Sequence, residues 1–265
     1  NAIMLSKIEK QIAMIFMNDY FYERALEFCE NEEDLLLYLI TEDMDFDLYL
    51  LANNYYRQAL CHQNIKSFDN ILPILDKAYS VLQKLSEDEY IKELKADIFS
   101  FKYQVHNHFN RLSEAEDNLI KSVELRKGLK VPETDAKLAE DFYSLGKISQ
   151  GNKEYEKAIG FLNESFDLFS KMSSNEVNNL YRLGRIQHSL GQIYLAKKDL
   201  YLSNVNFLEA VNYYQRCVEV DKQEYQCDLI RCCIELGDQF FQNKKATDAI
   251  SIYEIPLTYL NDLIK

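Results

Sequence analysis

The sequence contains little glycine or proline and no tryptophan. Its 265 residues include only 7 Gly and 3 Pro, which leaves few residues for tight β-turns or glycine-rich loops. It contains no G-x-x-x-x-G-K and no G-x-G-x-x-G segment, so neither of these phosphate-binding loops is present. These absences favour an almost entirely helical chain that lacks a nucleotide site of either kind.

Long apolar runs are also missing. No apolar run approaches the roughly 20 residues that a membrane-spanning helix needs, and the first residues, 1–7, lack the apolar segment of a signal peptide. The chain does not begin with Met, which is what a processed chain or a fragment of a longer one would show. We therefore expect a cytoplasmic protein that does not contact a membrane.

Positive charge is scarce relative to negative charge. The sequence has 43 Asp and Glu against 30 Lys and Arg, a net charge of −13, and the acidic residues are spread along the chain. Such a surface repels phosphate backbones. We expect no direct nucleic-acid binding by this segment, and a partner that is neutral or cationic.

The cysteines and histidines form no recognisable metal or catalytic pattern. The six Cys residues include no C-x-x-C pair. His106 and His108 would point to different sides of a helix, and the adjacent Cys61 and His62 cannot face each other as a nucleophile and its base. We therefore expect buried, reduced thiols, no metal, no cofactor and no catalytic residue.

One pattern does recur along the chain: a Leu-Gly pair followed at a fixed distance by a small residue. The glycines at positions 146, 191 and 237 are separated by 45 and 46 residues. Twelve positions after each glycine stands a small residue, and four positions later a large apolar one. A fixed interval of this size indicates stacked structural repeats.

The same register extends towards the N-terminus through Ala115, Ile71 and Ala25. Each repeat contains two stretches with the 3.6-residue apolar period of amphipathic helices. The sequence therefore predicts an all-α fold, a right-handed α-solenoid of about six antiparallel helix pairs with a period of 43–46 residues. We expect a single domain over 1–265, with repeats at roughly 1–44, 45–90, 91–132, 133–176, 177–222 and 223–265.

The recurring glycines predict close contact between helices. A glycine inside a helix costs about 1 kcal/mol relative to alanine, so its return at one register indicates that packing requires it. We expect a bulky side chain of the neighbouring helix to fill the space above each glycine. Pro73 lies inside a predicted helix and should kink it or delay its start.

At these positions the sequence resembles the tetratricopeptide repeat family. Leu190-Gly191-x2-Tyr194 with Ser203-x3-Phe207 matches the family pattern L-G-x2-Y followed by A-x3-F. The resemblance is strong over 134–255. The sequence lacks the Trp and the terminal Pro of the pattern, and its period exceeds the standard 34 residues. The longer helices of kinesin-light-chain-like and bacterial peptide-pheromone-receptor repeats would account for that period, whereas HEAT repeats would not explain the Leu-Gly-aromatic register.

The resemblance implies a binding surface on the first helix of each repeat, which lines the concave side. Candidate residues are the polar and aromatic ones outside the apolar packing face. Amides can donate to and accept from a peptide backbone, and Lys or Arg can bind a carboxylate. The candidates are Asn53, Tyr56, Gln104, Asn107, Tyr143, Lys147, Arg185, His188 and Gln192.

The leading hypothesis is a non-catalytic scaffold that binds a protein or peptide segment in its concave groove. The alternative is the peptide-sensing regulatory domain of a bacterial quorum-sensing-type transcription regulator, without its DNA-binding domain. Binding of a chaperone tail by a carboxylate clamp is a minor alternative, since only Lys147 and Arg185 are well placed for it. An enzyme is the least favoured class. Homodimerisation is left open.

Overall fold

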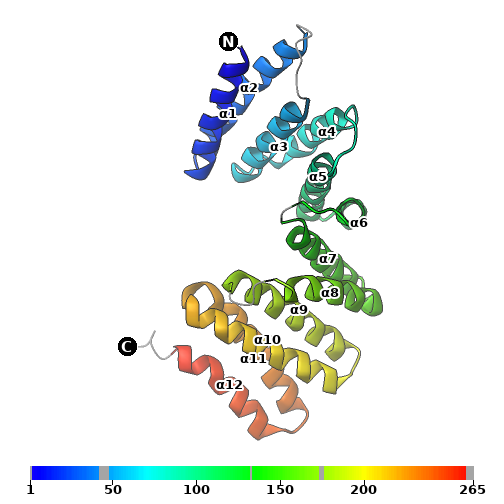
Figure 1. The fold of residues 1–265 in the computed structure, drawn as a ribbon. Helices are drawn as coiled ribbons and strands as arrows, with labels where there is room; N and C mark the ends of the chain where they lie inside the picture. Colours follow the sequence, from blue (N-terminus) through cyan, green and yellow to red (C-terminus); the bar gives the residue numbers. More distant parts are fainter. Residues whose placement is uncertain (1, 42–47, 132, 173–175, 261–265) are drawn as a thin grey trace. The chain divides into compact units, whose positions relative to one another are not determined.

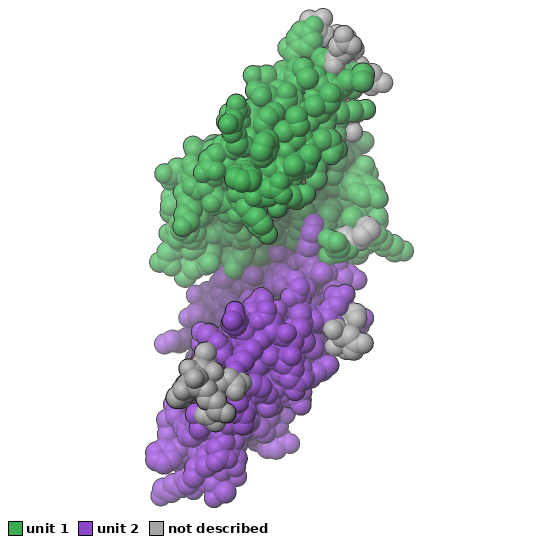
Figure 2. All heavy atoms as spheres, turned by 90° about the vertical axis from the view of Figure 1, so that its left-hand side faces the viewer, with its two compact units in different colours: residues 1–134 green, residues 135–265 purple. Residues whose placement is uncertain are grey.

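The computed structural model describes residues 2–41, 48–131, 133–172 and 176–260, and in these residues it contains helices and no β-strand. The contacts divide the chain into two compact units, residues 1–134 and residues 135–265, coloured green and purple in Figure 2. We describe each unit by itself. The all-helical prediction is confirmed, while the single domain and its repeat boundaries stay predictions.

The first unit contains six α-helices in its described residues (Figure 1). Helix α1 packs against α2, α3 against α4 and α5 against α6, and each pair also contacts the next one through α2–α3 and α4–α5. These helices are α1 (Ala2–Asn18), α2 (Tyr22–Thr41), α3 (Leu48–Asn64), α4 (Ile71–Leu82), α5 (Glu89–His108) and α6 (Leu112–Arg126).

The second unit repeats this arrangement. Helix α9 packs against α10 and α11 against α12, with further contacts between α8 and α9 and between α10 and α11. The helices are α7 (Thr134–Gly151), which begins at the last residue of the first unit, α8 (Tyr155–Ser170), α9 (Val177–Ala196), α10 (Leu200–Val220), α11 (Lys222–Gln242) and α12 (Ala246–Leu260). None of the described helices is both long enough and apolar enough to cross a membrane.

The turn inside each helix pair has one and the same hydrogen-bond pattern. After α9, the N–H of Asp199 donates to the carbonyl of Tyr194 and the N–H of Lys198 donates to that of Leu195, both at 2.9 Å. This is the Schellman motif, which satisfies carbonyl groups that the helix end leaves unpaired. Its left-handed position is occupied by Tyr20, Lys66, Asn110, Lys153, Lys198 and Lys244, all with φ between 56° and 64°.

The glycines lie where two helices approach each other closely, as predicted. A β-carbon added at Gly146 would lie 2.8 Å from the side chain of Leu162, and one at Gly191 would lie 2.9 Å from the ring of Phe207. At Gly237 the ring of Tyr253 occupies the same place. In each pair the bulky residue follows the glycine by sixteen positions. The repeat seen in the sequence is therefore a repeated packing contact.

The structure refines the predictions for Pro73 and for the cysteines. The start of α4 is delayed, because a 3-10 turn over Phe68–Asn70 precedes it. Pro73 falls in the first turn of the α-helix, where a backbone N–H has no helical partner, so the missing N–H of proline costs no hydrogen bond. The prediction of buried thiols holds for five cysteines but is wrong for Cys227, which is exposed on α11.

Candidate functional site

In the second unit the first helices of successive pairs are joined by polar contacts. Arg182 Nε donates to Glu140 Oε1 at 2.7 Å, which links α9 to α7. Tyr181 donates from its hydroxyl to Asp228 Oδ2 at 2.8 Å, which links α9 to α11. The partners are 42 and 47 residues apart in the sequence, about one repeat. Helices α7, α9 and α11 therefore lie side by side.

These three helices, together with one residue of α10, form a pocket of about 300 Å³. The pocket is lined by five of the nine predicted site residues: Tyr143, Lys147, Arg185, His188 and Gln192. The remaining lining residues are Tyr181, Ser189, Tyr214, Asp228 and Arg231.

One end of the pocket is cationic and aromatic. The guanidinium of Arg185 lies 4.3 Å from the ring centroid of Tyr143 and 5.8 Å from that of Tyr181, within range of a cation–π interaction. Its ion pair with Glu140 is long, at 3.9 Å. Lys147 Nζ donates to Gln150 Oε1 at 2.6 Å. Desolvation, and then the neighbouring charge of Arg185, lower the pKa of Lys147 from its ordinary value of 10.5.

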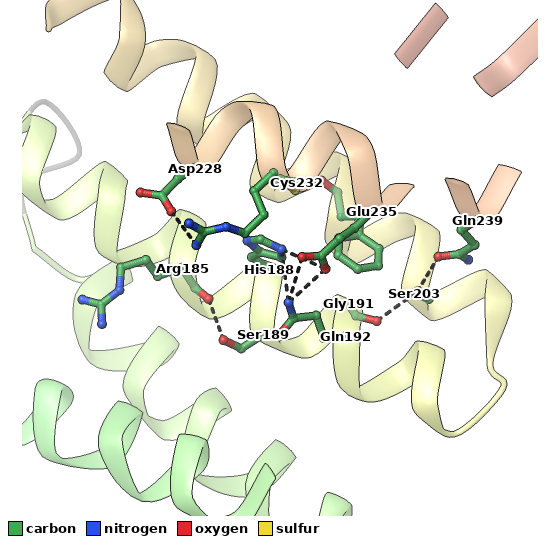
Figure 3. Close-up of polar contacts among 12 residues, drawn as sticks. Arg185, His188, Ser189, Gly191, Gln192, Ser203, Asp228, Cys232, Glu235 and Gln239 are labelled. Carbon is green, nitrogen blue, oxygen red and sulfur yellow. Dashed lines mark hydrogen bonds and ion pairs between the residues drawn. The ribbon is translucent and has the colours of Figure 1, made fainter. Parts of the chain in front are cut away.

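The other end is bounded by a polar cluster in which one side chain, that of His188, is buried. His188, only 7% exposed, places Nε2 3.2 Å from Glu235 Oε2, and Gln192 Nε2 donates to both oxygens of the same carboxylate at 2.9 and 3.2 Å. Figure 3 shows both side chains directed at Glu235. Burial opposes ionisation of Glu235, but the hydrogen bonds from His188 and Gln192 outweigh it and lower its pKa.

Small residues bring α10 close enough to hold this cluster in place. A β-carbon at Gly184 would lie 2.9 Å from the ring of Tyr214. The rings of Tyr214 and Phe207 in turn pack edge-on against His188, with centroids 6.0 and 5.7 Å away. The hydroxyl of Ser203 lies 2.9 Å from the carbonyl oxygen of Gly191 (Figure 3). The packing that the glycines permit therefore fixes the orientation of the pocket's histidine.

The four remaining predicted residues lie on α3 and α5 of the first unit. Asn53 is half-buried, and Gln104 and Asn107 are exposed. Gln104 Oε1 accepts a hydrogen bond from Gln63 at 3.1 Å. Tyr56 packs edge-on against Phe101 at 5.9 Å and borders the apolar core of this unit; burial raises the pKa of its hydroxyl. Tyr56 thus has a clear packing role.

Sequence reasoning missed five of the pocket residues. Tyr181 and Ser189 stand four positions to either side of Arg185, on the same face of α9. Asp228 and Arg231 follow Tyr181 and Arg185 by 47 and 46 residues, which is close to one repeat period. Helix spacing combined with the repeat interval would have found these four, whereas Tyr214 comes from a second helix. Among the described residues, no group of three or more His, Cys, Asp or Glu could hold a metal ion.

The arrangement of helix pairs, tight turns and adjacent first helices is that of a helical-repeat protein. No protein-family model and no curated protein matches the sequence. Among solved structures, BtubC (BKLC) from P. vanneervenii is 16% identical, with a TM-score of 0.69 over 91% of this chain and 92% of that chain.

Two further solved structures are similar over most of this chain. The TPR-like repeats of a kinesin light chain from Podosopora anserina are 16% identical, with a TM-score of 0.55 over 82% of this chain and 98% of that one. A Rap protein complexed with Competence and Sporulation Factor is 12% identical, with a TM-score of 0.54 over 100% of this chain and 77% of that one. The chain therefore has a tetratricopeptide-type repeat fold.

Proposed function

We propose that this chain is a non-catalytic scaffold that binds a protein or peptide segment, and that the pocket of α7, α9 and α11 is a principal contact. The observation that carries the proposal is the pairing of Lys147 with Arg185. Both side chains line the same pocket, and the charge of Arg185 helps to lower the pKa of Lys147, while the carboxylate of Glu235 opposes that shift. A further carboxylate placed beside both cations would be attracted by each of them.

The pocket residues divide into two groups with different roles. His188 and Gln192 already bond Glu235, so they hold α9 against α11 and support the pocket. Lys147, Arg185 and the more exposed Arg231 can contact a bound segment. The ammonium group of Lys147 and the guanidinium group of Arg185 can bind an acidic side chain. The neighbouring tyrosine rings can contact an apolar or aromatic side chain beside it. We therefore propose a segment that presents a carboxylate to Lys147 and Arg185, in place of the neutral or cationic partner that the net charge of the whole chain predicts.

The comparisons support this proposal at the level of the fold. The similar Rap protein was solved as a complex with Competence and Sporulation Factor, and repeat folds of this type present extended surfaces for binding. The same likeness favours the second candidate, a peptide-sensing regulatory domain. The scaffold and the sensor domain predict different behaviour on binding. A sensor domain must change conformation when it binds its peptide, whereas a scaffold need not.

The test is affinity capture with the Lys147→Gln/Arg185→Gln double variant and a matched control. The control, Lys171→Gln/Lys198→Gln, removes the same charge from two exposed positions of this unit. Partners identified by mass spectrometry should be retained by the wild type and the control and lost by the double variant, with unchanged helical circular dichroism. Equal capture by all three proteins would contradict the proposal.

The same partner distinguishes the two candidates. Hydrogen exchange of the free and the bound chain should show protection confined to the pocket helices if the chain is a scaffold. Altered exchange in helices away from the pocket would favour the sensor domain.

A further inference from the structure

The first unit contains a second, larger groove that the proposed function does not use. It has a volume of about 640 Å³ and is formed by α4, α5, α6 and the segment between α4 and α5. This size is within the usual range of small-molecule sites, roughly 300–1,000 Å³. Its lining residues are Asp76, Tyr79, Glu87, Lys95, Phe99, Lys102, Asn118, Lys121, Glu124 and Leu125.

Cations and anions are unequally buried in this groove. The side chains of Lys95 and Lys102 are 8% and 12% exposed, whereas those of their ion-pair partners Glu87 and Asp76 are 52% and 69% exposed. The ammonium groups therefore lie within the groove, 2.8 and 2.6 Å from carboxylates at its solvent-facing side. Because Glu87 and Asp76 are exposed to solvent, an incoming anion can take the place of either carboxylate at its lysine.

Two aromatic rings form part of the same wall. The rings of Tyr79 and Phe99 are 5.1 Å apart and tilted by 59°. Lys102 Nζ lies 5.5 Å from the centroid of Tyr79 and 5.7 Å from that of Phe99, and Lys121 Nζ lies 5.6 Å from that of Phe99. The chain's own ammonium groups thus stand over both rings. Next to the rings these ammonium groups favour an anionic group over a cationic one, and such a group must displace the carboxylate of Asp76, which is paired with Lys102.

We propose that this groove binds a small planar aromatic carboxylate. The flat body of the ligand contacts the edges of the Tyr79 and Phe99 rings, because the ammonium groups of Lys102 and Lys121 stand over the ring faces, and an edge-on contact is favourable. Its carboxylate accepts hydrogen bonds from Lys102 and Lys121, and the carboxylate of Asp76 moves into solvent. The groove belongs to residues 1–134 and does not depend on the pocket in residues 135–265.

The probe is terephthalate, titrated into the whole chain by isothermal calorimetry. The Lys102→Gln/Lys121→Gln variant should bind it at least about tenfold more weakly, since it lacks two charge-assisted hydrogen bonds. The matched control is Lys84→Gln/Lys130→Gln, which removes the same charge from two exposed positions of the same unit outside the groove. The control should bind like the wild type.

Two analogues separate charge from shape. Terephthalamide has the same ring without charge and should bind more weakly than terephthalate. Adipate has two carboxylates without a ring and should also bind more weakly. Added salt should reduce terephthalate affinity, because one groove lysine, Lys121, is exposed.

Several results would overturn the proposal. One is the absence of terephthalate binding by the wild type, and another is equal binding by the Lys102→Gln/Lys121→Gln variant. Equal affinity for terephthalamide would show that the lysines do not select an anion. Because loss of the largely buried side chain of Lys102 could disturb the fold, the single variant Lys121→Gln, at an exposed position, is measured as well. It should weaken binding without changing the thermal unfolding curve.

Discussion

Gly191 lies directly against the ring of Phe207, so that a β-carbon at position 191 would stand 2.9 Å from Cγ of that ring. Phe207 is fully buried, and its ring has little room to move away. The contact brings α9 and α10 together one turn from His188, which packs edge-on against the same ring. A packing requirement at a glycine is therefore linked directly to the geometry of the candidate pocket.

The first prediction concerns this glycine. Gly191→Ala should lower the free energy of unfolding by about 1 kcal/mol, because overpacking costs about 1–3 kcal/mol and the better helix propensity of alanine offsets about 1 kcal/mol of it. Gly160→Ala is the control, since a β-carbon at position 160 in α8 meets nothing within 4 Å. That variant should gain about 1 kcal/mol. Urea unfolding followed by circular dichroism measures both, and a stabilised Gly191→Ala would contradict the packing argument.

The second prediction concerns the turn between α9 and α10. Lys198 has a φ of 63°, a left-handed conformation that strains residues with a β-carbon by roughly 1 kcal/mol. Lys198→Gly should therefore be more stable than Lys198→Ala by about 1 kcal/mol. Both variants lose the same lysine side chain, so the comparison isolates the backbone. The melting temperatures of the two variants measure this difference in stability. Equal melting temperatures would show that the backbone at position 198 is not strained.

The sequence alone predicts the helical repeats well, because their signal is local. The apolar period of each helix and the Leu-Gly register are visible within single segments, and they led to the contacts of Gly146, Gly191 and Gly237. The turns were found only as polar breaks. Their Schellman geometry was not foreseen, since lysine, not glycine, occupies the left-handed position in four of them.

The candidate site was predicted less completely. Five residues on α7 and α9 do meet in one pocket. Asp228 and Arg231 were missed although they stand about one repeat after Tyr181 and Arg185, and Tyr214 was missed because it lies on α10, the second helix of its pair. The groove with Lys95, Lys102 and Phe99 left no sequence motif at all. Lys95 and Lys102 are seven residues apart on α5, Lys121 lies on α6, and only the folded chain brings Lys102 and Lys121 to the same ring.

The third prediction concerns Glu235 and pH. Its pKa in the folded protein lies below the ordinary value of 4.5, so its contribution to stability is present above pH 4.5 and is lost as the pH falls through the folded-state pKa. Glu235→Gln removes that contribution. At neutral pH the variant should be less stable by about 1 kcal/mol, allowing for solvent screening, and the difference should shrink on acidification.

The measurement is urea unfolding of both proteins at a series of pH values. Glu219→Gln, an exposed change on α10, is the control and should follow the wild type throughout. A difference between wild type and Glu235→Gln that stayed constant down to acidic pH would mean that the carboxylate charge of Glu235 does not stabilise the fold.

The fourth prediction concerns the two cations of the candidate pocket. Desolvation is the larger cause of the low pKa of Lys147, and the charge of Arg185 is the next. Arg185→Gln removes the second cause only, so the pKa of Lys147 should rise part of the way towards 10.5. NMR titration of the Lys147 side chain measures this shift. Arg231→Gln provides a control, because Arg231 is not among the charges that shift Lys147.

The same titration tests whether the pocket holds an anion. A bound carboxylate between Lys147 and Arg185 favours the charged form of the lysine, so a captured partner should raise the pKa of Lys147 in the wild type. The rise should be smaller in Arg185→Gln, where the anion is held by one cation. If the partner binds and the pKa of Lys147 does not move, the carboxylate of the partner lies elsewhere, and the two cations serve the packing of α7 against α9.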